Sequence, residues 1–245
     1  MTDHILNGVL GLAVGDALGY PAQGKSRESL KFSPVLAMQQ GLWSDDTSLT
    51  LCTLASLREN DWRLDYYDLM RRFAGWLQEG YLTPEGTAFD VGVTTKQALL
   101  NYLNRMSLER CAPRNQWNCG NGSLMRILPV EFYLQAHPEA NRYEAIRNVS
   151  ALTHAHICCT LGCFLYCTVA GELIQHRERF KLHTLLMRGV AKAVEELRQV
   201  ADADDNRELH YYSRIIDRSL YDLPAAEIES SGYVVDTLEA ALWCL

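Results

Sequence analysis

The helical spacing of apolar residues constrains the fold of this chain more than any other feature. Between residues 182 and 197 apolar side chains recur at three- and four-residue steps, with Lys, Arg and Glu between them. Helices are also predicted over residues 5–18, 47–58, 66–78, 96–105, 122–134, 143–152 and 157–175. Alternating apolar and polar runs of strand length are almost absent. The sequence therefore predicts an all-α fold, a single compact domain of roughly nine or ten helices over residues 1–245.

Proline, glycine and charge indicate where these helices stop. Loops are predicted at residues 21–24, 84–86 and 111–122, and Pro129 is expected to kink or end the helix over 122–134 early. The acidic stretch 201–210 reads as a solvated connector. The last helix is predicted to begin at Asp236, because Asp236 and Glu239 have the spacing of a capping box. It ends on apolar residues, so either it is buried at the end of the chain or the polypeptide continues.

Composition excludes several classes of protein. The chain has 23 Lys and Arg against 30 Asp and Glu, a net charge of −7, which argues against sequence-independent binding of nucleic acid. Four of the eight cysteines fall between residues 158 and 167 in an apolar run, where buried, reduced thiols on a core helix are expected. The longest run free of both charged residues and histidine, residues 157–171, is shorter than a membrane span of about 20 residues. With no signal peptide recognised, the sequence predicts a cytoplasmic protein without a membrane segment.

Ser44, Asp45, Asp46 and Thr47 stand directly before an apolar helical run. Serine or aspartate at such a position caps the free amides of a helix, and the helix dipole favours negative charge there. The alternative is a metal site, because hard oxygen donors so close in sequence suit Mg²⁺ or Mn²⁺. A cap needs one carboxylate, whereas two adjacent ones repel each other unless a cation or solvent relieves the repulsion.

The segment Gly120-Asn121-Gly122-Ser123 precedes a second predicted helix. Glycines let the backbone approach a ligand closely, and free amides at a helix start attract anions, so this segment is a candidate phosphate-binding loop. The alternative is an ordinary turn into the helix, with Ser123 near its cap.

Two further segments contain polar side chains with more than one interpretation. Residues 153–156 contain two histidines spaced by two, which do not share a helix face, so a zinc pair is not expected. Two roles are open for these histidines, contact with a substrate and capping of the next helix. Asp90 lies in a predicted turn, with Thr94 or Thr95 expected to cap the helix that follows.

Taken together, six segments in this order resemble the ADP-ribosylglycohydrolase family. They are residues 11–21 (GLAVGDALGYP), 43–47 (WSDDT), 90–95 (DVGVTT), 120–129 (GNGSLMRILP), 153–156 (THAH) and 232–243 (GYVVDTLEAALW). Each is weak alone, but six in register are specific, and the resemblance runs from the first helix to the end of the chain. It implies an all-helical hydrolase that removes ADP-ribose from a modified protein or small molecule by cleaving the glycosidic bond at ribose C1″.

The resemblance also assigns roles to individual residues. Ser44, Asp45 and Asp46 match the family motif that supplies ligands to two Mg²⁺ or Mn²⁺ ions, which activate water and hold the ribose hydroxyls. Asp46 and Asp90 are the candidate catalytic residues, with Asp90 near the scissile bond, where it would orient or accept a proton.

Substrate-binding roles follow in the same way. The matching family loop embraces the diphosphate, which points to Asn121, Gly122 and Ser123. The first histidine of the family's threonine-histidine motif lies beside the ribose, and here that residue is His154.

The chain departs from the family pattern in two places. Gln23 stands where the family has a glutamate, and an amide cannot accept a proton as a carboxylate does. The family's remaining metal ligands lie in a Gly-Gly-Asp-Thr-Asp-Thr segment beyond the helix matched by residues 236–243, and the chain ends first. The three matched ligands are too few for two octahedral ions. The sequence therefore predicts a C-terminally incomplete hydrolase domain or, alternatively, a catalytically impaired module that binds ADP-ribose or a partner protein.

Overall fold

A computed structural model describes residues 2–32, 42–200 and 202–245. The first half contains helices α1 (Thr2–Gly19), η1 (Tyr20–Ala22), α2 (Arg27–Phe32), α3 (Asp45–Glu59), α4 (Tyr66–Glu79), α5 (Val93–Leu103), α6 (Leu108–Cys111), η3 (Gln116–Asn118) and η4 (Leu124–Arg126). The second contains α7 (Leu128–Ala136), α8 (Arg142–Ala151), α9 (Ile157–His176), α10 (Leu182–Val200), α11 (Ala203–Arg207), η5 (Glu208–Tyr212), α12 (Ser213–Ile216), η6 (Ser219–Asp222), η7 (Ala225–Glu227) and α13 (Val234–Trp243). The described residues form no β-strand, only an isolated bridge between Gly120 and Tyr233. The predicted all-α class is therefore confirmed.

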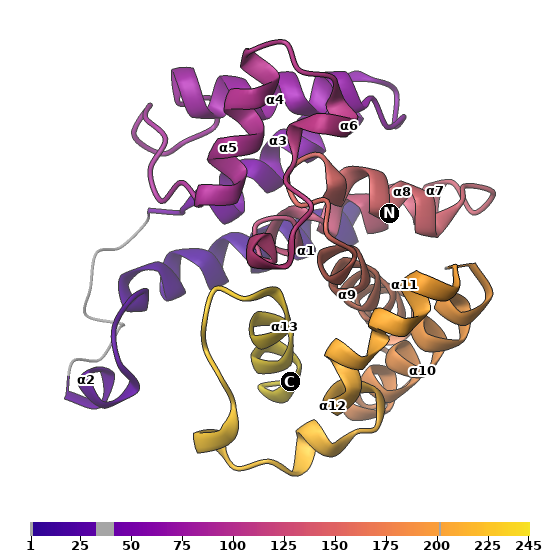
Figure 1. The fold of residues 1–245 in the computed structure, drawn as a ribbon. Coiled ribbons are helices and arrows are strands. Elements are labelled where there is room, and N and C mark those ends of the chain that lie inside the picture. Colours follow the sequence, from indigo (N-terminus) through magenta and orange to yellow (C-terminus); the bar gives the residue numbers. More distant parts are fainter. Residues whose placement is uncertain (1, 33–41, 201) are drawn as a thin grey trace.

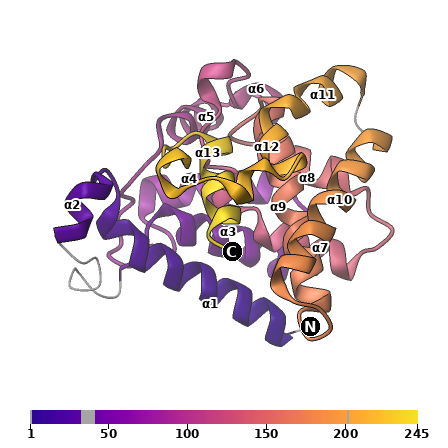
Figure 2. The same cartoon turned by 90° about the horizontal axis from the view of Figure 1, so that it is seen from below.

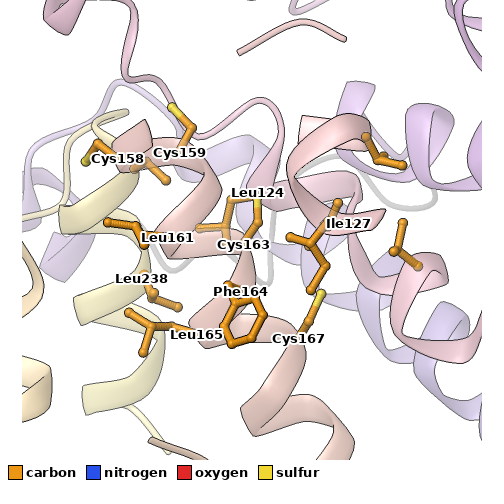
Figure 3. Close-up of a cluster of buried hydrophobic side chains, with 14 of the residues drawn as sticks. Leu124, Ile127, Cys158, Cys159, Leu161, Cys163, Phe164, Leu165, Cys167 and Leu238 are labelled. Atoms are coloured by element: carbon orange, nitrogen blue, oxygen red, sulfur yellow. The ribbon is translucent and has the colours of Figure 1, made fainter. Parts of the chain in front are cut away.

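Helix α9 is the centre of this single helical domain. It packs against α7, α8, α10 and α13, which come from both sides of it in the sequence (Figure 1). Its four cysteines are buried among leucine, isoleucine and phenylalanine side chains, with Leu238 of α13 in the same cluster (Figure 3). All eight cysteines are free, and Cys244 alone is exposed. The interpretation of the 158–167 cysteines as small core residues is confirmed.

Helices α1 and α3 bring the N-terminal part of the chain to the site. Helix α1 lies along one side of the molecule, and α3 crosses above it (Figure 2). Ser44 begins α3 as its N-cap, and its Oγ accepts a hydrogen bond from the Asp46 amide at 3.3 Å. Helix α3 also packs against η4, the short helix directly after the glycine loop, and Thr50 Oγ1 donates to the Met125 carbonyl at 3.3 Å. The two candidate regions of the sequence thus come together in space.

The predicted helix over 122–134 is wrong in its extent. The chain instead forms η4, breaks at Ile127, and begins α7 at Leu128 with Pro129 in its first turn. Proline is accommodated there because the first amides of a helix have no intrahelical partner to lose. Pro129 therefore starts a helix rather than ending one.

The acidic stretch 201–210 is also more ordered than predicted. Its described residues form α11 and the start of η5, which ends at the fully buried Tyr212. The Tyr212 hydroxyl donates to the Cys158 carbonyl at 2.8 Å, so a tertiary contact anchors this segment to α9. The charges of this segment predicted a solvated connector, but the packing of the buried Tyr212 ring that follows it holds the segment on the protein.

Helix α13 begins at Val234, two residues before the predicted start at Asp236. Its N-cap, Tyr233, makes no side-chain cap, and the Asp236 carboxylate accepts from Ser231 instead. The Val234 amide donates to the Cys119 carbonyl at 2.9 Å, which sets the point where the chain enters the helix. The apolar face of α13 packs on α9, with Leu238 and Leu242 buried.

Two helical segments are long and apolar enough to cross a bilayer by length and composition alone: Asp3–Ala22 and Ile157–His176. In the second, 72% of the apolar window is buried inside the protein, as expected of a core helix. In the first only 6% is buried. Its large exposed apolar side chains recur every four residues, at Leu6, Leu10, Val14 and Leu18. The absence of a membrane segment and the cytoplasmic location stay predictions of the sequence.

Candidate active site

Asp16 of α1 organises the start of α3. Its carboxylate accepts hydrogen bonds from the Ser44 amide and hydroxyl at 2.8 and 2.7 Å, and from the Thr47 amide and hydroxyl at 3.1 and 2.6 Å. The sequence analysis missed this residue, although it is an isolated acid near the end of an otherwise apolar helix. Asp16 holds the cap of α3, which leaves the two carboxylates beside Ser44 free for another role.

Asp45 and Asp46 repel each other and their neighbours. Burial raises the pKa of Asp45 to about 8, helped by the charges of Asp46, Asp90 and Asp16. Burial likewise raises the pKa of Asp46 to about 7, helped by Asp16 and Asp90. Asp90 itself is exposed, in a turn before α5 with a left-handed φ of 53°. The structure thus brings Asp90, 44 residues after Asp46 in the sequence, to the acidic cluster at Ser44, Asp45 and Asp46.

The buried carboxylates elsewhere in the described chain all have a cationic partner. Glu131 pairs with Arg142 at 2.6 Å, Glu172 with Arg188 at 3.2 Å and Lys192 at 3.3 Å, and Glu239 with Arg214 at 3.3 Å. Asp45 is equally buried, at 6% exposed, and its neighbouring charges are all negative. A buried charge without a partner is costly, so the doublet differs from the other buried carboxylates of the described chain in facing only negative charges.

The glycine loop and His154 form a second cluster. A Cβ on Gly122 would come within 2.7 Å of His154 Cε1 and 2.9 Å of Thr95 Oγ1, so only glycine fits this close approach. The Asn121 amide side chain donates to Thr237 Oγ1 at 3.1 Å, which ties the loop to α13. His154 is 2% exposed and lies directly behind the loop.

Ser123 faces the interior of the protein. Its hydroxyl is fully buried, accepts from Ser150 Oγ at 2.9 Å, and makes no cap to η4. Within the described chain the backbone amides of Gly122 and Ser123 donate to no acceptor. A ligand would therefore meet the backbone of this loop rather than the Ser123 hydroxyl.

Two capping expectations have different outcomes. His156 is the N-cap of α9, where its Nδ1 accepts from the Cys158 amide at 3.1 Å, so one of the two histidines is a cap. The expectation that Thr94 or Thr95 caps α5 is wrong, because α5 begins at Val93 and its N-cap is Gly92. Thr95 is instead buried inside the helix against the glycine loop, where tertiary packing uses it.

An aromatic pocket adjoins the glycine loop. Trp117, Tyr211 and Tyr233 line a surface pocket of about 600 Å³ together with Gly120, and Trp117 is 86% exposed. Flat aromatic rings at such a pocket can stack on a nucleobase. The sequence analysis missed these residues, because they come from three separate segments and no local motif joins them.

The acidic cluster fits the charge of a divalent ion but supplies only part of its coordination. The raised pKa values of Asp45 and Asp46 reflect oxygen ligands that lack a positive partner, which is the chemistry that Mg²⁺ requires. In the described ranges, however, no three Asp, Glu, His or Cys side chains are placed to hold one ion.

Comparison with known proteins gives a consistent result. The sequence model of the ADP-ribosylglycohydrolase family matches residues 1–245. The chain is 30% identical over 253 residues to "ADP-ribosylarginine hydrolase Tri1" of Pseudomonas putida, covering 99% of this chain and 61% of the relative. It is 27% identical to the protein of the same name from Serratia proteamaculans, covering 99% and 62%. It is 26% identical to "ADP-ribosyl-[dinitrogen reductase] glycohydrolase" of Rhodospirillum rubrum, covering 98% and 73%.

The chain therefore spans about three fifths of the length of the two hydrolases named first. The match to the family nevertheless extends over every residue of the chain, including the acidic cluster and the glycine loop. The chain belongs to the ADP-ribosylglycohydrolase family.

Proposed function

We propose that the protein is a hydrolase that removes ADP-ribose from arginine side chains of modified proteins. The observation that supports this most strongly is the unpaired, buried Asp45–Asp46 doublet close to a loop with free backbone amides. Family membership supports the reaction type, and the printed names of two relatives support arginine as the acceptor. An ADP-ribosylated small molecule would offer the same bond.

The chain's own residues account for binding. The amides of Gly122 and Ser123 would donate hydrogen bonds to the diphosphate, and the close packing of Gly122 on His154 holds the loop in place. Trp117 and Tyr233 would stack on the adenine in the adjoining pocket. In this proposal the second ribose would extend to the acidic cluster at the start of α3.

Hydrolysis needs a water oxygen to bond to C1″ while the bond from C1″ to the guanidine nitrogen breaks. The proton released by the water would go to the Asp46 carboxylate. Asp90, exposed beside the cluster, would orient the departing guanidine by accepting a hydrogen bond from it, and the guanidine, released as a neutral base, would take up the proton from Asp46. The charge of Asp90 raises the pKa of both Asp45 and Asp46, which supports placing the two roles at one acidic cluster.

Dependence on Mg²⁺ or Mn²⁺ is part of the proposal. Ser44, Asp45 and Asp46 would hold one or two such ions, which would increase the acidity of water and position the ribose hydroxyls. The small number of donors in the described chain means that solvent or substrate oxygens would complete the coordination.

The test is release of ADP-ribose from an ADP-ribosylated arginine protein, followed by chromatography in Mg²⁺ and in EDTA. We expect release in Mg²⁺, loss of release in EDTA, and recovery when Mg²⁺ is restored. Release that does not change with EDTA would contradict the metal requirement. No release under any condition would reject hydrolysis for this chain.

One observation favours a second function, a module that binds ADP-ribose without cleaving it. The metal donors of the described chain are incomplete, while the loop and aromatic pocket that would bind the nucleotide are present. Calorimetric titration with ADP-ribose separates the two functions. Binding that is as tight in EDTA as in Mg²⁺, without hydrolysis of the modified protein, would favour the binding module.

A further inference from the structure

A fully buried arginine beside the glycine loop forms no ion pair within the described residues. Arg126 is 0% exposed, and the titratable groups that act on its pKa are the Cys163 and Cys52 thiols rather than carboxylates. Its Nε and Nη1 atoms have no hydrogen-bond acceptor there, and its Cζ lies 4.5 Å from the centroid of the Phe73 ring. Burying a cation in this way is costly. The contacts that Arg126 does make therefore deserve a functional explanation.

Those contacts lead to His154. Arg126 Nη2 donates to Thr153 Oγ1 at 2.8 Å and to the Val149 carbonyl at 3.2 Å. Thr153 Oγ1 in turn lies 2.9 Å from His154 Nδ1. Arg126 and Thr153 are both 0% exposed, and His154 is 2% exposed, so water does not replace any member of this chain of hydrogen bonds.

The direction of each hydrogen bond follows from the groups involved. A guanidinium only donates, so Thr153 Oγ1 must accept from Arg126. The Thr153 hydroxyl proton then needs an acceptor, because buried polar hydrogens are rarely left unshared. Within the described chain, His154 Nδ1 is the acceptor in reach. Nδ1 is therefore unprotonated, and the proton of a neutral imidazole is on Nε2.

Electrostatics and packing agree with this assignment. Burial and the positive charge of Arg126 lower the pKa of His154 to about 3, so the ring is neutral near pH 7. Nε2 faces the glycine loop, since Cβ atoms on Gly122 and Gly120 would lie 3.2 and 3.5 Å from it. In the part of the chain that the structure describes, the hydrogen bonds of His154 are made by Nδ1, the carbonyl and the amide, and none is made by Nε2.

We propose that Arg126, acting through Thr153, is a positioning residue that holds His154 neutral with its proton on Nε2. This N–H is then presented to an oxygen atom of a ligand at the glycine loop. The identity of that ligand rests on the proposed function, in which the loop binds ADP-ribose, whereas the protonation of His154 in the free protein does not.

The direct test is a long-range ¹H–¹⁵N correlation spectrum of the ligand-free, ¹⁵N-labelled protein between pH 5.5 and 8 (about one unit either side of neutrality). The signals of His154, one of seven histidines, are identified by their absence in His154→Gln. We expect the shift of a protonated nitrogen for Nε2 and of an unprotonated nitrogen for Nδ1, both independent of pH. A proton on Nδ1, or a ring that titrates in this range, would overturn the proposal.

Variants identify the residues responsible. Thr153→Val removes the hydroxyl at nearly constant volume and should give a mixture of the two neutral tautomers, whereas Thr153→Ser should keep the wild-type spectrum. Arg126→Met should also give a mixture of tautomers, because the Thr153 hydroxyl is then free to accept a hydrogen bond from Nδ1. Arg126→Lys should restore the tautomer protonated on Nε2 in part. A wild-type His154 spectrum in folded Thr153→Val or Arg126→Met would contradict the proposal.

Thr168→Val is the matched control. Thr168 is a buried threonine of α9, 1% exposed, whose hydroxyl donates to the Phe164 carbonyl at 2.9 Å within the same helix. It should lose a similar hydrogen bond without changing the His154 signals. A change of the His154 tautomer in this control would show that general loosening of the core, rather than the Thr153 hydroxyl, sets the protonation.

Titration with ADP-ribose links the inference to the proposed function. Thr153→Val should weaken ADP-ribose binding by the inverse of the fraction of His154 that keeps its proton on Nε2, about 2-fold for an equal mixture of tautomers and about 10-fold where that fraction falls to about one tenth, while Thr168→Val keeps the wild-type affinity. Equal affinities for the wild type and Thr153→Val would refute the role of Nε2–H in binding. If the wild type binds no ADP-ribose, the proposed function fails, and the ligand-free spectrum still decides the protonation of His154.

Discussion

The two ends of α3 bury charge in opposite ways. At the C-terminal end, Arg72 is 4% exposed and pairs with Glu59 at 2.6 Å and with Asp68 at 2.7 Å. Although burial raises it, hydrogen bonds from arginine hold the pKa of Asp68 at about 2. At the N-terminal end, Asp45 and Asp46 face other carboxylates, and their pKa values rise to about 8 and 7.

This contrast distinguishes charges that stabilise the fold from charges that, in the proposed function, bind a metal ion. A completed ion pair stabilises the native state, and the protein loses stability when one partner of the pair is removed. Two adjacent carboxylates without a positive partner have the opposite effect, because they lower the stability of the native state unless a cation binds to them. Substitutions at the two ends of one helix should therefore have opposite consequences, and four measurements test this.

The largest expected effect is on catalysis. Asp46→Asn keeps the size of the side chain but cannot accept the proton from water, so hydrolysis of ADP-ribosylated arginine should fall about 10²–10⁴-fold. Initial rates of ADP-ribose release measure this. Glu59→Gln, at the opposite end of α3 and 49% exposed, is the control and should retain the wild-type rate. An Asp46→Asn variant with unchanged kcat would mean that Asp46 takes no part in the reaction.

The next effect is on stability. Arg72→Met removes the buried guanidinium shared by Asp68 and Glu59, leaves the exposed Arg71 as the cationic partner of Asp68, and should lower the free energy of unfolding by about 2 kcal/mol. Asp45→Asn should leave it unchanged or raise it at pH 8, because the substitution removes a repelled charge. Urea denaturation measures both. If Asp45→Asn proved as destabilising as Arg72→Met, the doublet would be structural and the contrast between the two ends would disappear.

Lowering the pH should reduce the stability that ion pairs contribute at the C-terminal end of α3, where Asp68 pairs with arginine, and not at the Asp45–Asp46 end. The pKa of Asp68 is lowered in the folded state, so its contribution is fully present above the unfolded value near 4 and is lost as the pH falls through about 2. Between pH 5 and pH 2.5 the stability advantage of the wild type over Asp68→Asn should shrink by about 1–2 kcal/mol. Urea unfolding at the two pH values measures it. An advantage that stays constant would show that the carboxylate is not held ionised by its arginines.

The smallest effect is the response to metal. At a free Mg²⁺ concentration ten times its Kd, binding to the folded state should add about 1.4 kcal/mol, which raises Tm by about 3–5 °C. Thermal unfolding in Mg²⁺ and in EDTA measures this shift. The double variant D45N/D46N should show no Mg²⁺ shift, whereas Arg72→Met should keep the full shift from its lower starting Tm. The same shift in D45N/D46N as in the wild type would place the ion elsewhere.

Much of the fold was predictable because helical periodicity is a local property. Helices with long periodic faces, such as α10, or with a continuous apolar composition, such as α9, agree with their predicted ranges to within a few residues. Single-turn helices such as α6 and α12 were not predicted, because one turn is too short for periodicity to be recognised. The start of α13 was misplaced because backbone pairing with Cys119, rather than a local cap, sets it.

The candidate site was predictable only in part, for the same physical reason. Sequence motifs identified Ser44, Asp45 and Asp46, but nothing near them in the sequence indicates that Asp16, 28 residues earlier, would hold the Ser44 hydroxyl. The link from Arg126 to Thr153 also joins residues 27 positions apart. Such partners become visible only when the helices are packed.

The sequence by itself determined the helical class, the buried cysteine helix and the family resemblance, because these depend on the order and spacing of residue types. Only the tertiary structure decided which charges have partners. Arg72 and the Asp45–Asp46 doublet are both ionisable groups beside the same helix, and no local pattern distinguishes them. Whether a buried ionisable group raises or lowers the stability of the folded state depends on the neighbours that distant segments bring to it, because electrostatic and hydrogen-bond energies depend on distances in space.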